Sequence, residues 1–211
     1  MDSKIFIDTF SEILQAGLPG EQSHAEVMPV SRKFTSDALK SATSLRQSAV
    51  GVILYPQDST INSVLIQRPN YEGTHSNQVS FPGGKMDDTD HDLEFTARRE
   101  CFEEVDLPMG FGKRIGELTN VYIPVSNFRV QPYVFFVDEL PSLTPDEREV
   151  ESIISFDVFK LIKDETLKST NLRMSQGFIQ KDVPYYDING HVVWGATAMM
   201  LSELKAILKQ F

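Results

Sequence analysis

The sequence predicts one mixed α/β (α+β) domain, and three observations support this fold class. The chain has 211 residues, enough for one domain with a sizeable core and too few for two comfortable ones. Segments rich in β-branched and apolar residues alternate with helical segments. No repeat, low-complexity segment or linker divides the chain. We therefore expect residues 1–211 to form a single domain, with an N-terminal helical extension at 1–45 and a catalytic core at 46–211.

The N-terminal extension is predicted to begin with an amphipathic helix. Apolar residues recur at helical spacing over Ile5–Leu14, and Gly17 and Pro19 then end the pattern. The apolar surface of this helix is the one feature that suggests a homodimer. Residues 20–45 carry no strong period, so we expect irregular structure with a short helix around Ser36–Ser41.

The core is predicted to consist of short strands with helices between them. Runs of β-branched and apolar residues bounded by turn residues are typical of strands. We expect strands at Ser48–Tyr55, Asn62–Gln67, Gln78–Phe81, Gly116–Val125, Phe128–Asp138, Ile153–Phe156, Phe178–Tyr186 and His191–Trp194. Further helices are expected at Phe159–Ile162 and Ala196–Leu208.

Charge and cysteine content exclude some classes of function. A formal net charge of −10 argues against nonspecific binding to nucleic acid or anionic membranes, since both require a basic surface. A single cysteine, Cys101, rules out an intrachain disulfide and fits a reducing compartment. Scattered N-terminal charges and the lack of a long apolar run indicate neither a signal peptide nor a transmembrane helix. We expect a cytoplasmic protein with no nucleic-acid or membrane partner.

A helix with an unusual acidic face is predicted after the break Pro82-Gly83-Gly84. Asp90 or Asp92 is suited to cap its N-terminus, and Pro108 follows its end. Three glutamates project within an arc of roughly 100° on this helix. They are Glu100, Glu103 and Glu104.

A helix face with three carboxylates has two interpretations. Glutamate-rich helices are usually solvated faces. Clustered oxygen donors also suit hard divalent cations such as Mg²⁺ or Mn²⁺. Arg99 can hold one carboxylate in place, and Gly83 and Gly84 allow the backbone to approach a ligand closely. This combination of features favours the metal-binding interpretation.

The stretch FPGGKMDDTDHDLEFTARRECFEEVDL resembles the Nudix box of the Nudix hydrolases. Asp90 stands in for the first glutamate of that box and is separated from Arg99 by eight residues rather than seven, and Asp106 replaces a glycine at the helix end. The positions that match are Gly84, Arg99, Glu100, Cys101, Glu103, Glu104 and Leu107. The resemblance implies a Nudix-type α/β/α sandwich with a mixed β-sheet and a metal-dependent hydrolase of nucleoside diphosphate derivatives. We interpret Cys101 as a core residue and not as a nucleophile.

The segment LIQRPNYEGTHSNQVSFPGG resembles the second motif of the coenzyme A pyrophosphatase branch of that family. Arg68, His75, Gln78 and Phe81–Gly84 match it, whereas an expected second arginine is missing at Gly73 or Thr74. The segments IPVSNFRVQPYV and VVWGATAMML are also similar to this branch. The resemblance implies that the substrate is coenzyme A or a thioester of it. The alternatives are another substrate such as NADH or ADP-ribose, and a Nudix module that binds without cleaving.

The resemblance and the residue chemistry together suggest roles for individual side chains. Glu100, Glu103, Glu104 and the carbonyl of Gly84 are the expected metal ligands. The expected substrate-binding residues are Arg68, His75, Gly83 and Gly84, because arginine pairs bidentately with phosphate and the glycines leave room. The expected catalytic residues are Glu103, Glu104, Arg99 and Glu149. The general base is left open between Glu103, Glu104 and Glu149. Phe128, Tyr133 and Tyr185 are either core residues or aromatic partners for adenine.

Overall fold

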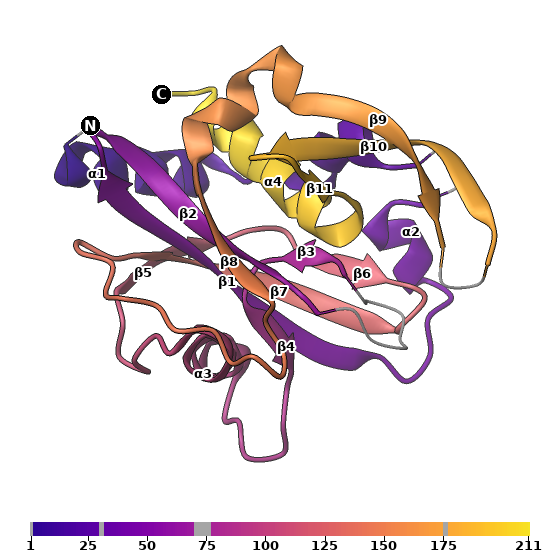
Figure 1. Ribbon diagram of the computed structural model, residues 1–211, viewed down its shortest axis with the longest axis horizontal. Helices are drawn as coiled ribbons and strands as arrows, with labels where there is room; N and C mark the ends of the chain where they lie inside the picture. Colours follow the sequence, from indigo (N-terminus) through magenta and orange to yellow (C-terminus); the bar gives the residue numbers. More distant parts are fainter. Residues whose placement is uncertain (1, 30–31, 70–76, 175–176) are drawn as a thin grey trace.

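The computed structural model describes residues 2–29, 32–69, 77–174 and 177–211. Its main sheet has eight strands and is centred on β1 (Arg46–Gln57). β1 pairs with β2 (Thr60–Gln67) and β4 (Gly83–Lys85) in antiparallel orientation and with β7 (Phe128–Phe136) in parallel orientation. The sheet is therefore mixed, as expected (Figure 1).

The other strands of the main sheet pair with β2 or β7. β3 (Val79–Ser80) and β8 (Ser152–Asp157) pair with β2. β5 (Lys113–Glu117) and β6 (Val121–Ile123) pair with successive parts of β7. The prediction of one strand over Gly116–Val125 was therefore wrong. The strand is interrupted after Glu117: the Leu118 amide still donates to the Pro132 carbonyl of β7, but proline has no N–H to return the bond.

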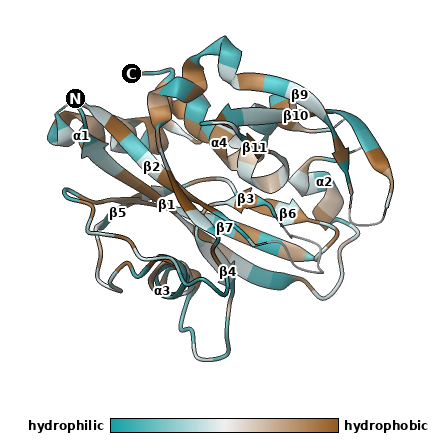
Figure 2. Ribbon diagram, viewed as in Figure 1, coloured by the Kyte–Doolittle hydropathy of each residue, from teal (hydrophilic) through white to brown (hydrophobic). Residues whose placement is uncertain are grey.

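Helices cover both faces of this sheet, which makes the layered α/β/α sandwich. Side chains alternate along β1, so Ala49 and Ile53 face α3 (Leu93–Val105) while Val50 and Val52 face the opposite helices. Figure 1 shows α3 on one side and α4 (Gly195–Leu208) on the other. Hydrophobic stretches of β1 and β2 lie between these layers (Figure 2).

A second, three-stranded sheet lies beside α4. It consists of β9 (Leu167–Arg173), β10 (Ile179–Ile188) and β11 (His191–Val193), all antiparallel. The sequence analysis missed β9, because its residues are polar or only partly buried and carry no clear alternation. Its pairing with β10, the next strand along the chain, determines that it is a strand.

The N-terminal residues form several short elements that pack on the core. They are α1 (Ser3–Ala16), the 3₁₀ helix η1 (Gly20–Val27) and α2 (Thr35–Leu39). η1 lies where irregular structure was expected, and it contacts α4. The remaining elements are the 3₁₀ helices η2 (Val158–Ile162) and η3 (Asp164–Thr166). No helix in the described part of the chain is long and apolar enough to cross a membrane.

The apolar face of α1 is used within this chain. Phe6 and Phe10 are completely buried and belong to the same core cluster as residues of α4. Ile5, by contrast, is 64% exposed. The surface that suggested a homodimer is thus largely covered by the chain's own core, and a dimer stays a prediction.

Candidate active site

The acidic helix α3 has well-defined ends. The Asp92 carboxylate accepts a hydrogen bond from the Phe95 amide at 2.7 Å and caps the N-terminus. At the C-terminus of the helix, Asp106 adopts the left-handed conformation with φ 56°. Glycine is the residue that usually occupies this position. Of the two candidate caps, Asp92 is therefore the cap, and Asp90 has another partner.

That partner is Arg99. Asp90 is buried and accepts two parallel hydrogen bonds from the guanidinium, Nε to Oδ1 at 2.9 Å and Nη2 to Oδ2 at 2.8 Å. The Thr96 hydroxyl and the Asp87 amide also donate to this carboxylate. Because charged donors stabilise the ionised form, Arg99 holds the pKa of Asp90 well below its usual range.

Arg99 also contacts two of the three helix glutamates. Its Nη1 donates to Glu100 Oε1 and Glu103 Oε2, both at 2.9 Å, and its Nη2 donates to the Lys85 carbonyl at 3.0 Å. The expectation that Arg99 holds a carboxylate is thus confirmed. One guanidinium, fixed by Asp90, determines where two carboxylates of α3 lie.

The third glutamate, Glu104, points toward the Gly-Gly segment. Its side chain is 2% exposed, and Oε2 accepts a hydrogen bond from the Gly83 amide at 2.8 Å. Arg68 Nη1 lies 3.3 Å from Oε1. Burial outweighs these favourable contacts and raises the pKa of Glu104 to about 8, and the nearby carboxylates of Glu100 and Glu149 add to the effect.

Gly84 leaves no room between β4 and the Glu100 carboxylate. A Cβ atom at Gly84 would lie 2.5 Å from Glu100 Oε1. Burial raises the pKa of Glu100 despite its contact with Arg99. The carbonyl of Gly84 accepts a hydrogen bond from Ser48 Oγ at 2.6 Å.

Arg68 connects this cluster to Glu149. Its Nη2 lies 4.0 Å from Glu149 Oε2, and the Glu149 side chain is 55% exposed. The predicted site residues Arg68, Gly83, Gly84, Arg99, Glu100, Glu103, Glu104 and Glu149 therefore form one connected group. The other predicted substrate-binding residue, His75, lies outside the described residues. Cys101 is buried and packs against Gly51 below the helix, as expected for a core residue.

The carboxylate oxygens are ligands of the kind that divalent cations prefer. In this structure they bond instead to Arg99 and to the Gly83 amide. Within residues 2–29, 32–69, 77–174 and 177–211, no three His, Cys, Asp or Glu side chains converge as a metal-binding group. Arg99 holds Glu100 and Glu103, whereas Glu104 turns toward Gly83. A buried oxygen cluster in which carboxylates raise one another's pKa matches the donor set that Mg²⁺ or Mn²⁺ prefers.

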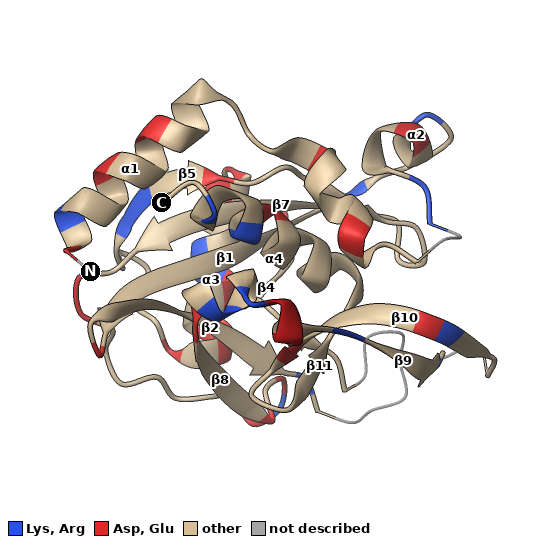
Figure 3. Cartoon of the chain, turned by 90° about the horizontal axis from the view of Figure 1, so that it is seen from above, with Lys and Arg blue, Asp and Glu red and all other residues tan. Residues whose placement is uncertain are grey.

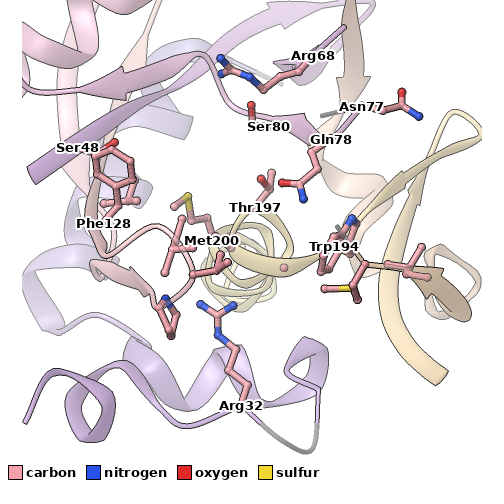
Figure 4. Close-up of a pocket in the computed structure, with 18 of the residues that line it drawn as sticks. Arg32, Ser48, Arg68, Asn77, Gln78, Ser80, Phe128, Trp194, Thr197 and Met200 are labelled. Carbon is pink, nitrogen blue, oxygen red and sulfur yellow. The ribbon is translucent and has the colours of Figure 1, made fainter. Parts of the chain in front are cut away.

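A cavity of about 1140 Å³ adjoins this cluster (Figure 4). Arg68, Gly83 and Gly84 belong both to its wall and to the carboxylate cluster. The opposite wall is formed by the start of α4 and by the β9–β10 hairpin, including Trp194, Thr197 and Met200. The cavity therefore extends from the glutamate helix toward the second sheet.

Of the three aromatic candidates for binding adenine, one is among the described residues that line this cavity. Phe128 lines it, with the Arg46 guanidinium 4.0 Å from its ring centroid. Tyr133 lies beside Arg114, and neither it nor Tyr185 is among the described lining residues. The sequence analysis treated Trp194 only as the end of a strand. Its place in the wall depends on the docking of β11 and α4 against the main sheet, for which the sequence carries no local signal.

The model of the family described as "NUDIX domain" matches residues 45–177. The chain belongs to the Nudix family. The match begins just before β1 and covers the main sheet, α3 and β9, so the resemblance read from the box is confirmed. Residues 1–44, with α1, η1 and α2, lie outside the matched part.

Two curated relatives have different names. "Mitochondrial coenzyme A diphosphatase NUDT8" from Homo sapiens is 33% identical over 130 residues, which cover 61% of this chain and 54% of that protein. "Nudix hydrolase 22, chloroplastic" from Arabidopsis thaliana is 28% identical over 173 residues, covering 78% and 56%. The chain thus spans little more than half the length of these relatives. Their names place them in organelles, so the cytoplasmic location stays a prediction.

Solved structures of other Nudix proteins share the fold. The binary complex of the C. elegans Ap4A hydrolase aligns with a TM-score of 0.52 and 14% identity, covering 79% of this chain and all of that one. The NUDIX domain of Shewanella oneidensis NrtR, complexed with ADP ribose, aligns with a TM-score of 0.53 and 12% identity, covering 83% and 99%. These alignments confirm the predicted Nudix-type sandwich.

Proposed function

We propose that this chain is a metal-dependent diphosphatase that cleaves coenzyme A or its thioesters to 3′,5′-ADP and (acyl-)4′-phosphopantetheine. The observation that carries the hydrolase proposal is the contact of Glu100 and Glu104 with Gly83–Gly84 at the wall of a large cavity. The substrate is supported by the second motif and by the relative named as a coenzyme A diphosphatase. The preference for one acyl chain over another stays open.

In this proposal, α3 supplies the groups that hold the metal. Glu100, Glu103, Glu104 and the Gly84 carbonyl would bind Mg²⁺ or Mn²⁺. A cation held there would neutralise charge on the diphosphate and make a nearby water more acidic. Arg99 positions two of the carboxylates through its contacts with Glu100 and Glu103.

Arg68 and the glycines are proposed to bind the diphosphate. Arg68 reaches the cavity wall beside the carboxylates, and its fork of donors suits phosphate oxygens. Gly83 and Gly84 have no side chains to keep the diphosphate away from the backbone. His75 stays a predicted phosphate contact from the neighbouring segment.

The general base is proposed to be one of Glu103, Glu104 and Glu149, and we favour Glu149. Its carboxylate is more than half exposed and lies beside Arg68, where it can accept a proton from water attacking a bound phosphate. Glu104 is less suited, because the Gly83 amide and Arg68 already hold its two oxygens.

We also propose a single domain at residues 1–211, with 1–45 as an extension on a core at 46–211. Burial of Phe6 and Phe10 in the main core supports this arrangement. A cytoplasmic location and a homodimer remain predictions. Mass measurement of the purified protein in solution, over a range of concentrations, tests the dimer.

Product analysis by mass spectrometry tests the proposed reaction. The purified protein is incubated with coenzyme A and Mg²⁺ or Mn²⁺, and we expect 3′,5′-ADP and 4′-phosphopantetheine. ADP-ribose and NADH serve as competing substrates, because the missing arginine of the second motif favours them as the second candidates. A tenfold higher kcat/KM for ADP-ribose than for coenzyme A would refute the coenzyme A assignment.

Matched variants distinguish catalysis from contamination. Glu103→Gln should abolish metal-dependent turnover, whereas Glu12→Gln, at an exposed position of α1, should leave it unchanged. If the wild-type protein cleaves no diphosphate with either metal, the enzymatic proposal fails and a ligand-binding Nudix module is the remaining function.

A further inference from the structure

The cavity carries a charge pattern that differs from that of the chain as a whole. The protein has a net charge of −10, and acidic residues lie on α1, α2 and β10 (Figure 3). The described residues that line the cavity nevertheless include no Asp or Glu. They do include four basic residues: Arg32, Arg68, Lys85 and Arg173. Such a concentration of positive charge favours a ligand with several negative charges.

Arg32 differs from the other three basic residues. Lys85 and Arg173 are exposed to solvent, and Arg68 already faces the carboxylates of Glu104 and Glu149. Arg32 is partly buried, and among the described residues no carboxylate is recorded within ion-pair distance of it. Burial lowers the pKa of its guanidinium.

Toward the described residues, the side chain of Arg32 makes one hydrogen bond. Nη2 donates to the Tyr122 carbonyl at 2.8 Å, which orients the guanidinium. A guanidinium has five N–H donors, so four remain beyond the bond to the Tyr122 carbonyl, and Arg32 lines the cavity. Figure 4 shows Arg32 pointing into the cavity from the side opposite to Arg68.

We propose that Arg32 binds a phosphate monoester of the substrate, at the end of the cavity remote from the diphosphate. This inference rests on the proposed function, in which the diphosphate lies between Arg68 and the α3 glutamates. Between the two arginines the wall carries Phe128 and Met200 together with uncharged polar residues such as Thr197, and this mixture suits a base rather than a charged group.

The charges on coenzyme A indicate which of its groups would bind Arg32. Its pantetheine part is uncharged, whereas its adenosine carries a 3′-phosphate with up to two negative charges. A partly buried guanidinium without an acidic partner gains most from such a dianion. Arg32 would thereby distinguish coenzyme A from diphosphates that have no third phosphate, such as ADP-ribose and NADH.

The position of Arg32 in the chain gives the N-terminal extension a role in substrate choice. Arg32 precedes the part of the chain that matches the family, residues 45–177. The packing of residues 32–39 beside β6 brings Arg32 to the cavity. The extension is then a specificity-determining element and not only a support for the core.

A pair of substrates that differ only in the 3′-phosphate tests this inference. Coenzyme A and 3′-dephospho-coenzyme A are assayed with wild type, Arg32→Gln, Arg32→Lys and Lys33→Ala. Glutamine keeps an N–H donor but is shorter and has no charge, lysine keeps the charge without the fork, and Lys33 is an exposed neighbour that is not among the described lining residues. We expect Arg32→Gln to lower kcat/KM about 10- to 100-fold for coenzyme A and less than about twofold for the dephospho form. Arg32→Lys should recover part of the loss, and Lys33→Ala should match wild type.

A binding measurement separates this inference from the proposed reaction. The chain has one tryptophan, Trp194, and it lies in the cavity wall, so its fluorescence reports on ligands there. We expect 3′,5′-ADP to bind at least about tenfold more tightly than 5′-AMP in wild type, and Arg32→Gln to remove that difference. This result is independent of catalysis. An absence of hydrolysis with an intact Arg32-dependent preference refutes the proposed reaction and leaves the phosphate site standing.

The opposite outcomes would overturn the inference. Equal losses on both substrates in Arg32→Gln would mean that Arg32 contacts the diphosphate or only supports the fold. Equal binding of 3′,5′-ADP and 5′-AMP by the wild-type protein would mean that the cavity has no site for the monoester.

Discussion

Replacing Gly84 by alanine is expected to separate activity from stability. Gly84 lies in β4, opposite Ala49 of β1, and its backbone conformation is open to any residue. The added Cβ would lie 2.5 Å from Glu100 Oε1, much closer than a carbon and an oxygen atom can approach. Because the contact is with the end of a flexible side chain, the Glu100 carboxylate moves and the backbone keeps its position.

The structure sets the size of both effects. A displacement of about 1 Å at a functional group costs on the order of 100-fold in rate. The change in the free energy of unfolding should stay within about 1 kcal/mol. Alanine lowers the entropy of the unfolded chain, which stabilises the folded state by about 0.4–1 kcal/mol. The weakened ion pair between Arg99 and Glu100 destabilises it by a similar amount, so the two effects offset each other.

Gly83→Ala is the matched control for this prediction. At Gly83 a Cβ would lie 2.6 Å from the Val50 Cα, and the φ of +155° disfavours any side chain. We therefore expect Gly83→Ala to lower the free energy of unfolding by about 3 kcal/mol, since backbone cannot move aside as a side chain can. Urea denaturation gives the stabilities, and kcat/KM over a range of Mg²⁺ and Mn²⁺ concentrations gives the functional effect.

The reasoning about Gly84 fails in either of two cases. If Gly84→Ala has the same kcat/KM and metal dependence as the wild-type protein, the location of the Glu100 carboxylate does not matter for activity. A loss of stability as large as that of Gly83→Ala would show that the helix and β4, rather than the Glu100 side chain, yield to the added methyl group.

Two further predictions follow from the buried carboxylates. Asp90→Asn should lower the free energy of unfolding at pH 7 by about 2–3 kcal/mol, because it breaks the paired hydrogen bonds from Arg99. The folded pKa of Asp90 is depressed, so its contribution exists above about pH 4 and is lost as pH falls, and the two proteins should become equally stable in acid denaturation. Glu104→Gln should abolish turnover and yet stabilise the metal-free protein at pH 9 by upward of about 1 kcal/mol. The pKa of Glu104 is about 8 in the folded protein and about 4 in the unfolded chain, so the folded protein loses stability as pH rises from about 4 to 8. At pH 4.5 this loss is small, and thermal unfolding of the wild type and of Glu104→Gln should differ little.

The functional helix could be predicted from the sequence because its signals are local. Capping by Asp92, the left-handed Asp106 and the common face of the glutamates depend on residues within a few turns of each other. The contact of Arg99 with Glu103 follows from their i,i+4 spacing on the helix. The family resemblance rests on this stretch as well.

What only the tertiary structure decided concerns contacts between distant segments. The direction of Glu104 depends on the Gly83 amide, which the pairing of β4 with β1 brings to α3. β9 carries no clear pattern of its own, and even its pairing with the neighbouring strand β10 shows only in the folded chain. Arg32 and Trp194 face one cavity although 161 positions lie between them, and no periodicity in either segment indicates this. Local sequence patterns encode helix faces and caps, whereas the shape and charge of a cavity arise only when the sheet, α4 and the N-terminal extension pack together.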